Sequence, residues 1–243
     1  GMELDVNSIS TATYDTKQDV LWVQDNNDGT WAMHKVDPKT GKSLETSGAS
    51  GAGVPLWDSA YCEYLSGNST KVASVFGYYL LSPADPMNLT TNAFDWSQFL
   101  SGYSKGTKLV ALASGGYVEY ENDEGTKLDT EFFYMLDDAG YMWVLWMYDT
   151  GNGSYSCDLN YFPTDLSNKD FPLNGQNQYC SMWEDHETGI LYLSYFTGTT
   201  NELYMLSLDT ETESIVSTYL GDMGDDVWPA TIISAKYNGE AAG

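Results

Sequence analysis

Seven residues of this chain combine aromatic rings with carboxylates where the sequence predicts loops or junctions between a loop and a strand. They are Trp57, Asp58, Trp96, Tyr179, Asp225, Asp226 and Trp228. An aromatic ring stacks on the apolar C–H face of a sugar, while a nearby carboxylate accepts hydrogen bonds from the hydroxyl groups. The pattern predicts a binding surface for a neutral glycan or a cationic peptide. The alternative is that Trp57 and Trp228 only repeat one packing position.

Three carboxylates suggest a second chemistry. Asp58, Glu131 and Asp226 fall on or beside different predicted strands. Glycoside hydrolysis requires a carboxylate pair about 5–5.5 Å apart for retention or ~6.5–9.5 Å apart for inversion. No local motif marks these three residues as such a pair. We therefore expect a non-catalytic binding or interaction protein, and a glycan-active enzyme is the alternative. Carboxylates that converge in one pocket favour the enzyme, whereas a lining of Thr, Tyr and Ser favours binding.

The two histidines and the acidic loops do not form a recognisable metal-binding pattern. Asp25-Asn26-Asn27-Asp28-Gly29 is rich in oxygen ligands, but its glycine comes one position too early for a calcium loop. His186 stands among carboxylates in Glu184-Asp185-His186-Glu187, which suits a metal ligand or an acid–base pair. Its place in a predicted turn favours a solvated side chain instead. We expect no metal and no cofactor.

The three cysteines, Cys62, Cys157 and Cys180, have no CxxC spacing. A zinc site typically needs such spacing, and a disulfide framework needs an even number of cysteines. Each cysteine lies in or beside an apolar or aromatic stretch, where a free thiol behaves as a small hydrophobic group. The sequence predicts three buried thiols, with one Cys157–Cys180 disulfide as the alternative.

The composition excludes several classes of partner. The 243 residues contain 35 Asp plus Glu against 10 Lys plus Arg, a formal net charge of −25. Binding a nucleic acid requires a cationic surface, so a nucleic acid is excluded as a partner. No apolar run approaches the ~20 residues that span a bilayer. The polar, lysine-poor composition suits an exported or cell-surface protein, and a membrane anchor upstream of Gly1 is compatible with it.

An internal repeat is the best signal of organisation. Three blocks recur in the same order over about 45 residues, a length typical of a four-stranded propeller blade. The matched blocks are Val20–Val23 with Ile190–Leu193, Trp31–Gly41 with Leu203–Glu213, and Leu56–Asp58 with Val227–Pro229. Within the second block, Asp37 to Gly41 and its counterpart at Asp209 read as tight turns rather than phosphate loops.

The intervening sequence predicts further strands. Leu109–Ala113 and Tyr117–Glu121 read as a hairpin with Gly115-Gly116 in its turn. Only Ala93–Leu100 has helical spacing. Counting the units gives starts near Ile9, Trp57, Ser101, Glu131 and Tyr179.

We therefore expect an all-β fold, a β-propeller of about five four-stranded blades, with six as the alternative count. The strand Val227–Tyr237 would pair with the N-terminal segment, because closing the ring removes the open sheet edges. This assigns residues 1–8 to an N-terminal segment, 9–237 to one propeller domain and 238–243 to a tail.

Two stretches carry a resemblance to a known family. Tyr14-Asp15 followed by Val20-Leu21-Trp22, and then Lys35-Val36-Asp37-Pro38-Lys39-Thr40-Gly41-Lys42, resemble the repeats of bacterial exported β-propellers of the quinoprotein-like and YVTN type. The resemblance covers residues 9–60 and 179–236. It implies an exported propeller whose aromatic and acidic loop residues ring one mouth of a central channel, and it leaves the activity open. The chain is shorter than the eight-bladed quinone enzymes of that group, so their cofactor is not expected.

Overall fold

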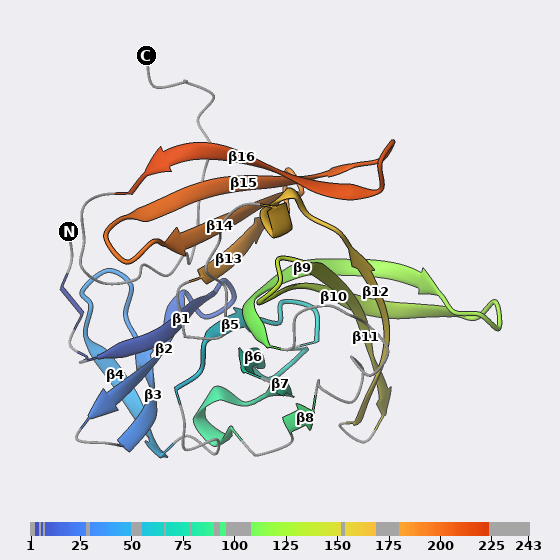
Figure 1. Cartoon of the computed structure of the whole chain (residues 1–243). Coiled ribbons are helices and arrows are strands. Elements are labelled where there is room, and N and C mark those ends of the chain that lie inside the picture. Colours follow the sequence, from blue (N-terminus) through green and yellow to red (C-terminus); the bar gives the residue numbers. More distant parts are fainter. Residues whose placement is uncertain are drawn as a thin grey trace.

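A computed structural model of the chain describes residues 3–4, 6, 8–27, 30–49, 55–65, 67–77, 79–89, 93–95, 108–151, 154–168 and 180–223. These residues form four antiparallel sheets of four strands, and the strands of every sheet follow one another in chain order. The described residues contain no α-helix. The chain is all-β, as its sequence predicts (Figure 1).

The strands of the four sheets have the following bounds. The first sheet contains β1 (Ile9–Asp15), β2 (Val20–Asn27), β3 (Thr30–Val36) and β4 (Ser43–Ala49). The second contains β5 (Asp58–Tyr61), β6 (Val72–Phe76), β7 (Tyr79–Ala84) and β8 (Ala93–Asp95). The third contains β9 (Leu109–Glu121), β10 (Lys127–Asp137), β11 (Met142–Gly151) and β12 (Ser154–Phe162). The fourth contains β13 (Cys180–Asp185), β14 (Ile190–Phe196), β15 (Asn201–Asp209) and β16 (Ser214–Asp222). Two short 3-10 helices, η1 (Pro86–Asn88) and η3 (Asp165–Asn168), follow β7 and β12.

The first and fourth sheets contain the matched sequence blocks. The block at Val20 lies on β2 and the block at Ile190 lies on β14, and both are second strands. The next block occupies the third strands, β3 and β15. The first two pairs of blocks thus lie on corresponding strands of two sheets, whereas Val227–Pro229 lies outside the described residues.

Aspartates make the tight turns between strands. Asp15 Oδ1 accepts the backbone N–H of Lys17 at 2.9 Å after β1, and Asp185 Oδ1 accepts that of Glu187 at 3.0 Å after β13. The predicted turn at Asp37 is confirmed, because its Oδ1 accepts the N–H of Lys39 at 2.8 Å. Asp209 does the same with Glu211 at 2.9 Å. A short carboxylate that bonds the backbone two residues ahead is why this residue type recurs at turns.

Apolar side chains join each sheet to the next along the chain. The first and second sheets share one core cluster, the second and third share another, and the third and fourth share a further one. Pairs drawn from the two sheets of each cluster are Trp22 with Leu81, Val75 with Phe133, and Leu136 with Leu193. Burial of these faces supplies the main favourable free energy of folding.

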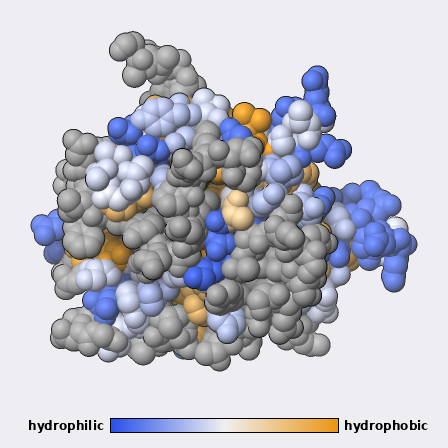
Figure 2. Space-filling model, in the orientation of Figure 1, coloured by the Kyte–Doolittle hydropathy of each residue, from blue (hydrophilic) through white to orange (hydrophobic). Residues whose placement is uncertain are grey.

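The first strands of the four sheets lie at the centre of the molecule. β9 packs against both β5 and β13, and β5 also packs against β1. Figure 1 shows the four sheets around this centre, with the far ends of β9 and β10 projecting outward. The projecting end is hydrophilic in Figure 2, in keeping with the exposed polar residues of the β9–β10 turn.

The predicted Gly-Gly hairpin in the third sheet is wrong. Residues 109–121 form one strand, β9, and Gly115-Gly116 lie at a bulge where the register to β10 shifts by one residue. Gly116 has a φ of +78°, and a Cβ atom at Gly115 would lie 2.1 Å from Cε2 of Phe132. The ring leaves no room for a side chain at Gly115, and Gly116 has a left-handed backbone. A left-handed glycine occurs in bulges as well as in turns.

The error in the hairpin also explains the count of units. The unit predicted to start near Glu131 begins inside the third sheet, because Glu131 lies within β10, the second strand of that sheet. The strand before it, β9, was assigned to the unit predicted to start near Ser101. The described residues therefore form four sheets rather than five. The terminal strand Val227–Tyr237 lies outside them. The predicted helix at Ala93–Leu100 is wrong for Ala93–Asp95, which pair with β7 as β8, and its remainder lies outside the described residues.

All three cysteines are free thiols, so the alternative disulfide is not formed. Cys62 and Cys180 are buried as predicted, whereas Cys157 is only half-buried. Burial raises the pKa of all three thiols. Within the described part of the chain, no helix is both long and apolar enough to cross a membrane.

Candidate binding site at the centre of the sheets

Asp58 connects three of the central strands. It begins β5 and is 1% exposed. Its Oδ2 accepts the backbone N–H of Leu112 on β9 at 2.9 Å and that of Met182 on β13 at 3.0 Å. Its Oδ1 accepts the N–H of Ser59 at 3.0 Å and the hydroxyl of Ser181 at 3.3 Å. Burial raises the pKa of Asp58 to about 7, against these four hydrogen bonds, which favour the ionised form.

Glu131 makes a similar connection one sheet further on. Its Oε2 accepts the N–H of Leu65 at 2.8 Å, and its Oε1 accepts the hydroxyl of Ser114 at 2.6 Å. The glutamate lies on β10 and is fully buried. Burial raises its pKa, and the hydrogen bond from Leu65 opposes the shift. Asp58 and Glu131 therefore hold strands and loops together and present no uncommitted carboxylate oxygen.

A cavity of about 320 Å³ opens where the central strands end. All four sheets contribute to it through their first strands or the turns that follow them. Its lining residues are Thr13, Tyr14, Thr16, Ser59, Ala60, Tyr61, Glu63, Ala113, Ser114, Met182, Trp183, Glu184, Asp185, His186 and Glu187. Its volume lies at the lower end of the ~300–1,000 Å³ typical of ligand pockets. One small ligand or one side chain of a larger ligand fits such a space.

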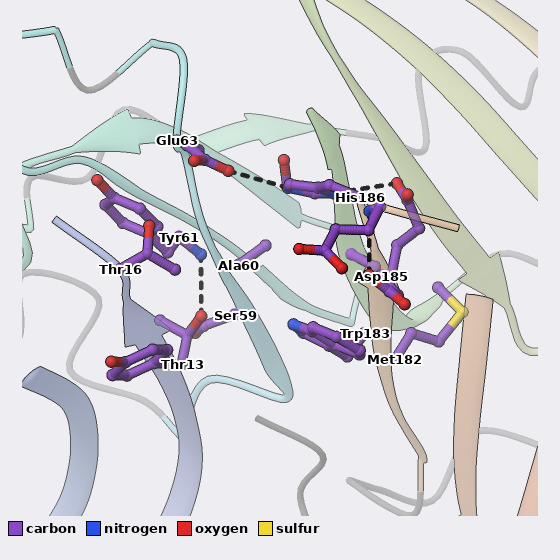
Figure 3. A pocket seen from close by; sticks show the side chains of 15 residues that line it. Thr13, Thr16, Ser59, Ala60, Tyr61, Glu63, Met182, Trp183, Asp185 and His186 are labelled. Carbon is purple, nitrogen blue, oxygen red and sulfur yellow. Dashed lines mark hydrogen bonds and ion pairs between the residues drawn. The ribbon is translucent and has the colours of Figure 1, made fainter. Parts of the chain in front are cut away.

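The walls of the cavity differ in chemistry. Figure 3 shows Thr13, Ser59 and Tyr61 on one side and Trp183 and Asp185 on the other. The first side is fixed by a hydrogen bond from the backbone N–H of Tyr61 to Thr13 Oγ1 at 2.9 Å. On the second side, the half-buried Trp183 ring stacks on Tyr192, with ring centroids 6.2 Å apart. The cavity thus offers hydroxyl groups on one side and an indole on the other.

His186 lies between two carboxylates at one end of the cavity. Its Nε2 is 3.3 Å from Glu63 Oε2, and its Nδ1 is 3.4 Å from Glu184 Oε2. Figure 3 shows Glu63 reaching His186 from the β5–β6 turn. Contact with Glu184 raises the pKa of His186 despite burial, which lowers it, and Glu63 adds to the rise. When it is protonated, this imidazole is an internal cation that partly neutralises the carboxylates at this end.

Glu184 has unused binding capacity. Its side chain is 4% exposed and its Oε2 atom, although in ion-pair range of His186, accepts no hydrogen bond from the described residues. Buried carboxylate oxygens normally have hydrogen-bonded partners, so an exception calls for an explanation. The oxygen belongs to a cavity-lining residue but has almost no exposed surface of its own, so a ligand that supplies the missing donor must displace a neighbouring side chain.

The lining is strongly anionic. Glu63, Glu184, Asp185 and Glu187 face one histidine, and no lysine or arginine is among the described residues of the lining. Hydrogen bonds from Thr188 and the Glu187 N–H lower the pKa of Asp185, so this carboxylate remains ionised in mild acid. A cationic group meets Coulomb attraction here and two kinds of aromatic ring, indole and phenol, whereas an anion meets repulsion.

None of the predicted site residues that the structure describes lines this cavity. Trp57 is half-buried, and its ring packs against the core shared by the third and fourth sheets, at the opposite end of β5 from the cavity. Asp58 and Glu131 hold the structural bonds described above. Trp96, Tyr179, Asp225, Asp226 and Trp228 lie outside the described residues.

The sequence drew attention to His186 but not to the residue that pairs with it in the cavity. His186 is in a turn as predicted, but the turn faces the cavity and the side chain is 35% exposed rather than fully solvated. Its partner Glu63 belongs to another sheet, and no local pattern links the two. The described residues hold no group of three or more His, Cys, Asp or Glu side chains arranged for a metal ion.

A second cavity of about 550 Å³ lies between the third and fourth sheets. Its lining is mostly apolar and aromatic and includes Phe132, Tyr134, Trp146, Ile190 and Met205. None of the lining residues that the structure describes is charged. Burial raises the pKa of Tyr134 to about 12, so its phenol stays neutral. The hydroxyl groups of Tyr134, Thr188 and Ser207 are few against the apolar lining, so this space suits an apolar ligand better than a charged one.

No protein-family model matches the sequence, and no curated protein matches it. Function is therefore inferred from the chemistry of the central cavity.

Proposed function

We propose that the chain is a non-catalytic binding protein with a β-propeller fold, whose blades include the four described sheets. The support for the propeller is that each sheet is a four-stranded meander. In addition, consecutive sheets share core clusters, and all four sheets line one central cavity. In a propeller, the first strands of the blades surround a central channel in this way.

The ligand is a cationic group, and we assign it to a basic side chain of a peptide. The observation that carries this proposal is the buried Glu184 oxygen that accepts no hydrogen bond from the described residues, on the wall of an anionic, partly aromatic cavity. A lysine or arginine side chain supplies the missing donor, while its charge is attracted by Glu187 and the cavity's other carboxylates. The chain's net charge of −25 draws basic peptides toward it and repels anions.

A neutral glycan is the other ligand that the sequence suggested, and the hydroxyl side of the cavity is compatible with it. The glycosidase alternative has less support, because Asp58 and Glu131 use their oxygens in hydrogen bonds to the protein. Export to the cell surface is also part of the proposal, on the strength of the composition and the family resemblance. Localisation of the tagged protein by cell fractionation tests this part.

Calorimetric titration with three short peptides tests the function. The peptides are identical except for one central lysine, glutamine or glutamate. The lysine peptide is expected to bind at least about tenfold more tightly than the glutamine peptide, which corresponds to ~1.4 kcal/mol, and the glutamate peptide to bind most weakly. Raising the salt concentration should weaken the lysine peptide most, because ions screen the attraction.

Two charge-neutralising variants form a matched pair for this titration. Glu187 and Glu211 lie in two turns of similar local geometry, each donating its N–H to an aspartate two residues earlier. Only Glu187 lines the cavity. Glu187→Gln should weaken the lysine peptide several-fold, whereas Glu211→Gln should leave its affinity unchanged. Equal effects of the two variants, or preferential binding of neutral oligosaccharides over all three peptides, would contradict the proposal.

A further inference from the structure

Two exposed tyrosines form a pair beside the cavity. Tyr64 and Tyr117 are 37% and 54% exposed, and their ring centroids are 5.0 Å apart. Tyr64 belongs to the β5–β6 turn and Tyr117 to β9, so the pair bridges the second and third sheets. Exposed aromatic rings gathered in one place are characteristic of binding surfaces. We refer to Tyr64, Tyr117 and Asp129 as the tyrosine shelf.

Asp129 makes this shelf anionic and fixes its geometry. The Tyr117 hydroxyl donates to Asp129 Oδ1 at 2.9 Å, and this hydrogen bond raises the pKa of Tyr117. Burial and the same carboxylate raise the pKa of Tyr64. Both phenols therefore stay neutral, and both rings are held near one negative charge. A ring face next to a carboxylate suits an ammonium or guanidinium group.

The shelf is continuous with the cavity. Glu63, which pairs with His186, immediately precedes Tyr64. On the other strand, Gly116 immediately precedes Tyr117, and a Cβ atom at Gly116 would lie 3.5 Å from the His186 ring. The ion pair between Glu63 and His186 thus marks the border between the two surfaces.

We infer that the tyrosine shelf binds a second basic residue of the same peptide, an inference that rests on the proposed function. One basic side chain occupies the cavity, and the next lies against Tyr64 and Tyr117 with its charge toward Asp129. Because Glu63 of the cavity and Tyr64 of the shelf are consecutive in the chain, the two surfaces adjoin, and we expect the two basic residues to be near neighbours in the peptide. The ligand class is therefore a peptide with adjacent or nearly adjacent lysines or arginines.

The test compares a peptide carrying one lysine with a peptide of the same length carrying two neighbouring lysines. For the parent protein, the second lysine should strengthen binding about fivefold, as expected for a cation–π contact at a partly exposed site. Tyr117→Ala should reduce this gain to less than twofold and leave the affinity for the one-lysine peptide unchanged. Tyr117→Phe keeps the ring and should retain most of the gain.

Tyr219→Ala is the matched control. Tyr219 is 53% exposed, packs against Tyr204 and donates to Asp222 at 2.5 Å, but it lies on the outer strand β16. This variant should retain the full gain from the second lysine. A gain that survives Tyr117→Ala, or falls equally in Tyr219→Ala, overturns the assignment of the shelf.

The same titrations separate the two proposals. If the one-lysine peptide binds and the second lysine adds nothing, the shelf inference fails and the proposed function stands. If neither basic peptide binds, both fail. If neutral oligosaccharides bind instead and lose affinity in Tyr117→Ala, the shelf belongs to a glycan site and the basic-peptide inference is overturned.

Discussion

Replacing Asp58 should destabilise the whole domain, because one carboxylate satisfies donors from three central strands. In Asp58→Ala, the backbone N–H groups of Ser59, Leu112 and Met182 lose their acceptor in the protein interior. Leaving a buried donor unsatisfied costs about 1–3 kcal/mol, so the three together cost about 3–9 kcal/mol. That is a large part of the ~5–15 kcal/mol by which domains are stable.

Asp58→Asn should have a smaller effect. The Ser181 hydroxyl, which donates to Oδ1, can rotate and accept from the new amide, leaving the N–H of Ser59 without its acceptor. The expected cost is about 1–3 kcal/mol, or a fall in Tm of ~2–12 °C for a chain of this size.

Urea unfolding at pH 8, above the raised pKa of about 7, measures both variants against an ionised parent. Asp123→Asn, in the exposed β9–β10 turn, is the control and should lie within about 0.5 kcal/mol of the parent. If Asp58→Ala were equally harmless, Asp58 would not be the connection between strands that its hydrogen bonds indicate. Its carboxylate would then be available for a ligand, as the sequence first suggested.

Three further predictions concern the bulge, the histidine and the thiols. Gly115→Ala should lower the free energy of unfolding by about 1–3 kcal/mol in urea, because its Cβ would overlap a phenylalanine ring; an unchanged midpoint would contradict the close approach. His186 has a raised pKa, so its stabilising contribution is complete below its ordinary value of 6.5 and is lost as pH rises through the folded-state pKa. The stability difference between the parent and His186→Gln should therefore shrink with rising pH, and a difference that grows would refute the ion pairs. In native protein, mass spectrometry should find a thiol reagent on Cys157 first, with Cys62 and Cys180 labelled only after unfolding; rapid labelling of all three would contradict their burial.

The sequence predicted the fold class well where strands repeat a pattern. β2 and β14 share an apolar run after a polar turn, and the physical cause is common to both, since each is a buried second strand that follows an aspartate turn. The same reasoning failed at Gly115-Gly116. A glycine pair satisfies a hairpin turn and a bulge equally well, and only the Phe132 ring on the neighbouring strand distinguishes them.

The central cavity was beyond sequence reasoning for a different reason. Glu63 follows a strand of the second sheet and His186 follows a strand of the fourth. Their contact therefore depends on how the sheets pack and not on local spacing. Glu184 was visible as one acid among many, but its lack of a hydrogen-bond donor depends on burial. Trp57 beside Asp58 was conspicuous in the sequence, but the structure uses the ring against the core and the carboxylate in hydrogen bonds between strands.

A crystal structure of the protein with a bound lysine peptide tests the cation site most directly. We expect the lysine nitrogen in the central cavity within hydrogen-bonding distance of Glu184 Oε2, the buried oxygen that accepts no hydrogen bond from the described residues. We also expect Trp183 alongside the lysine's aliphatic carbons. A peptide bound at the Trp57 end of the central strands, or a cavity that stays empty at saturating peptide concentration, would contradict the account.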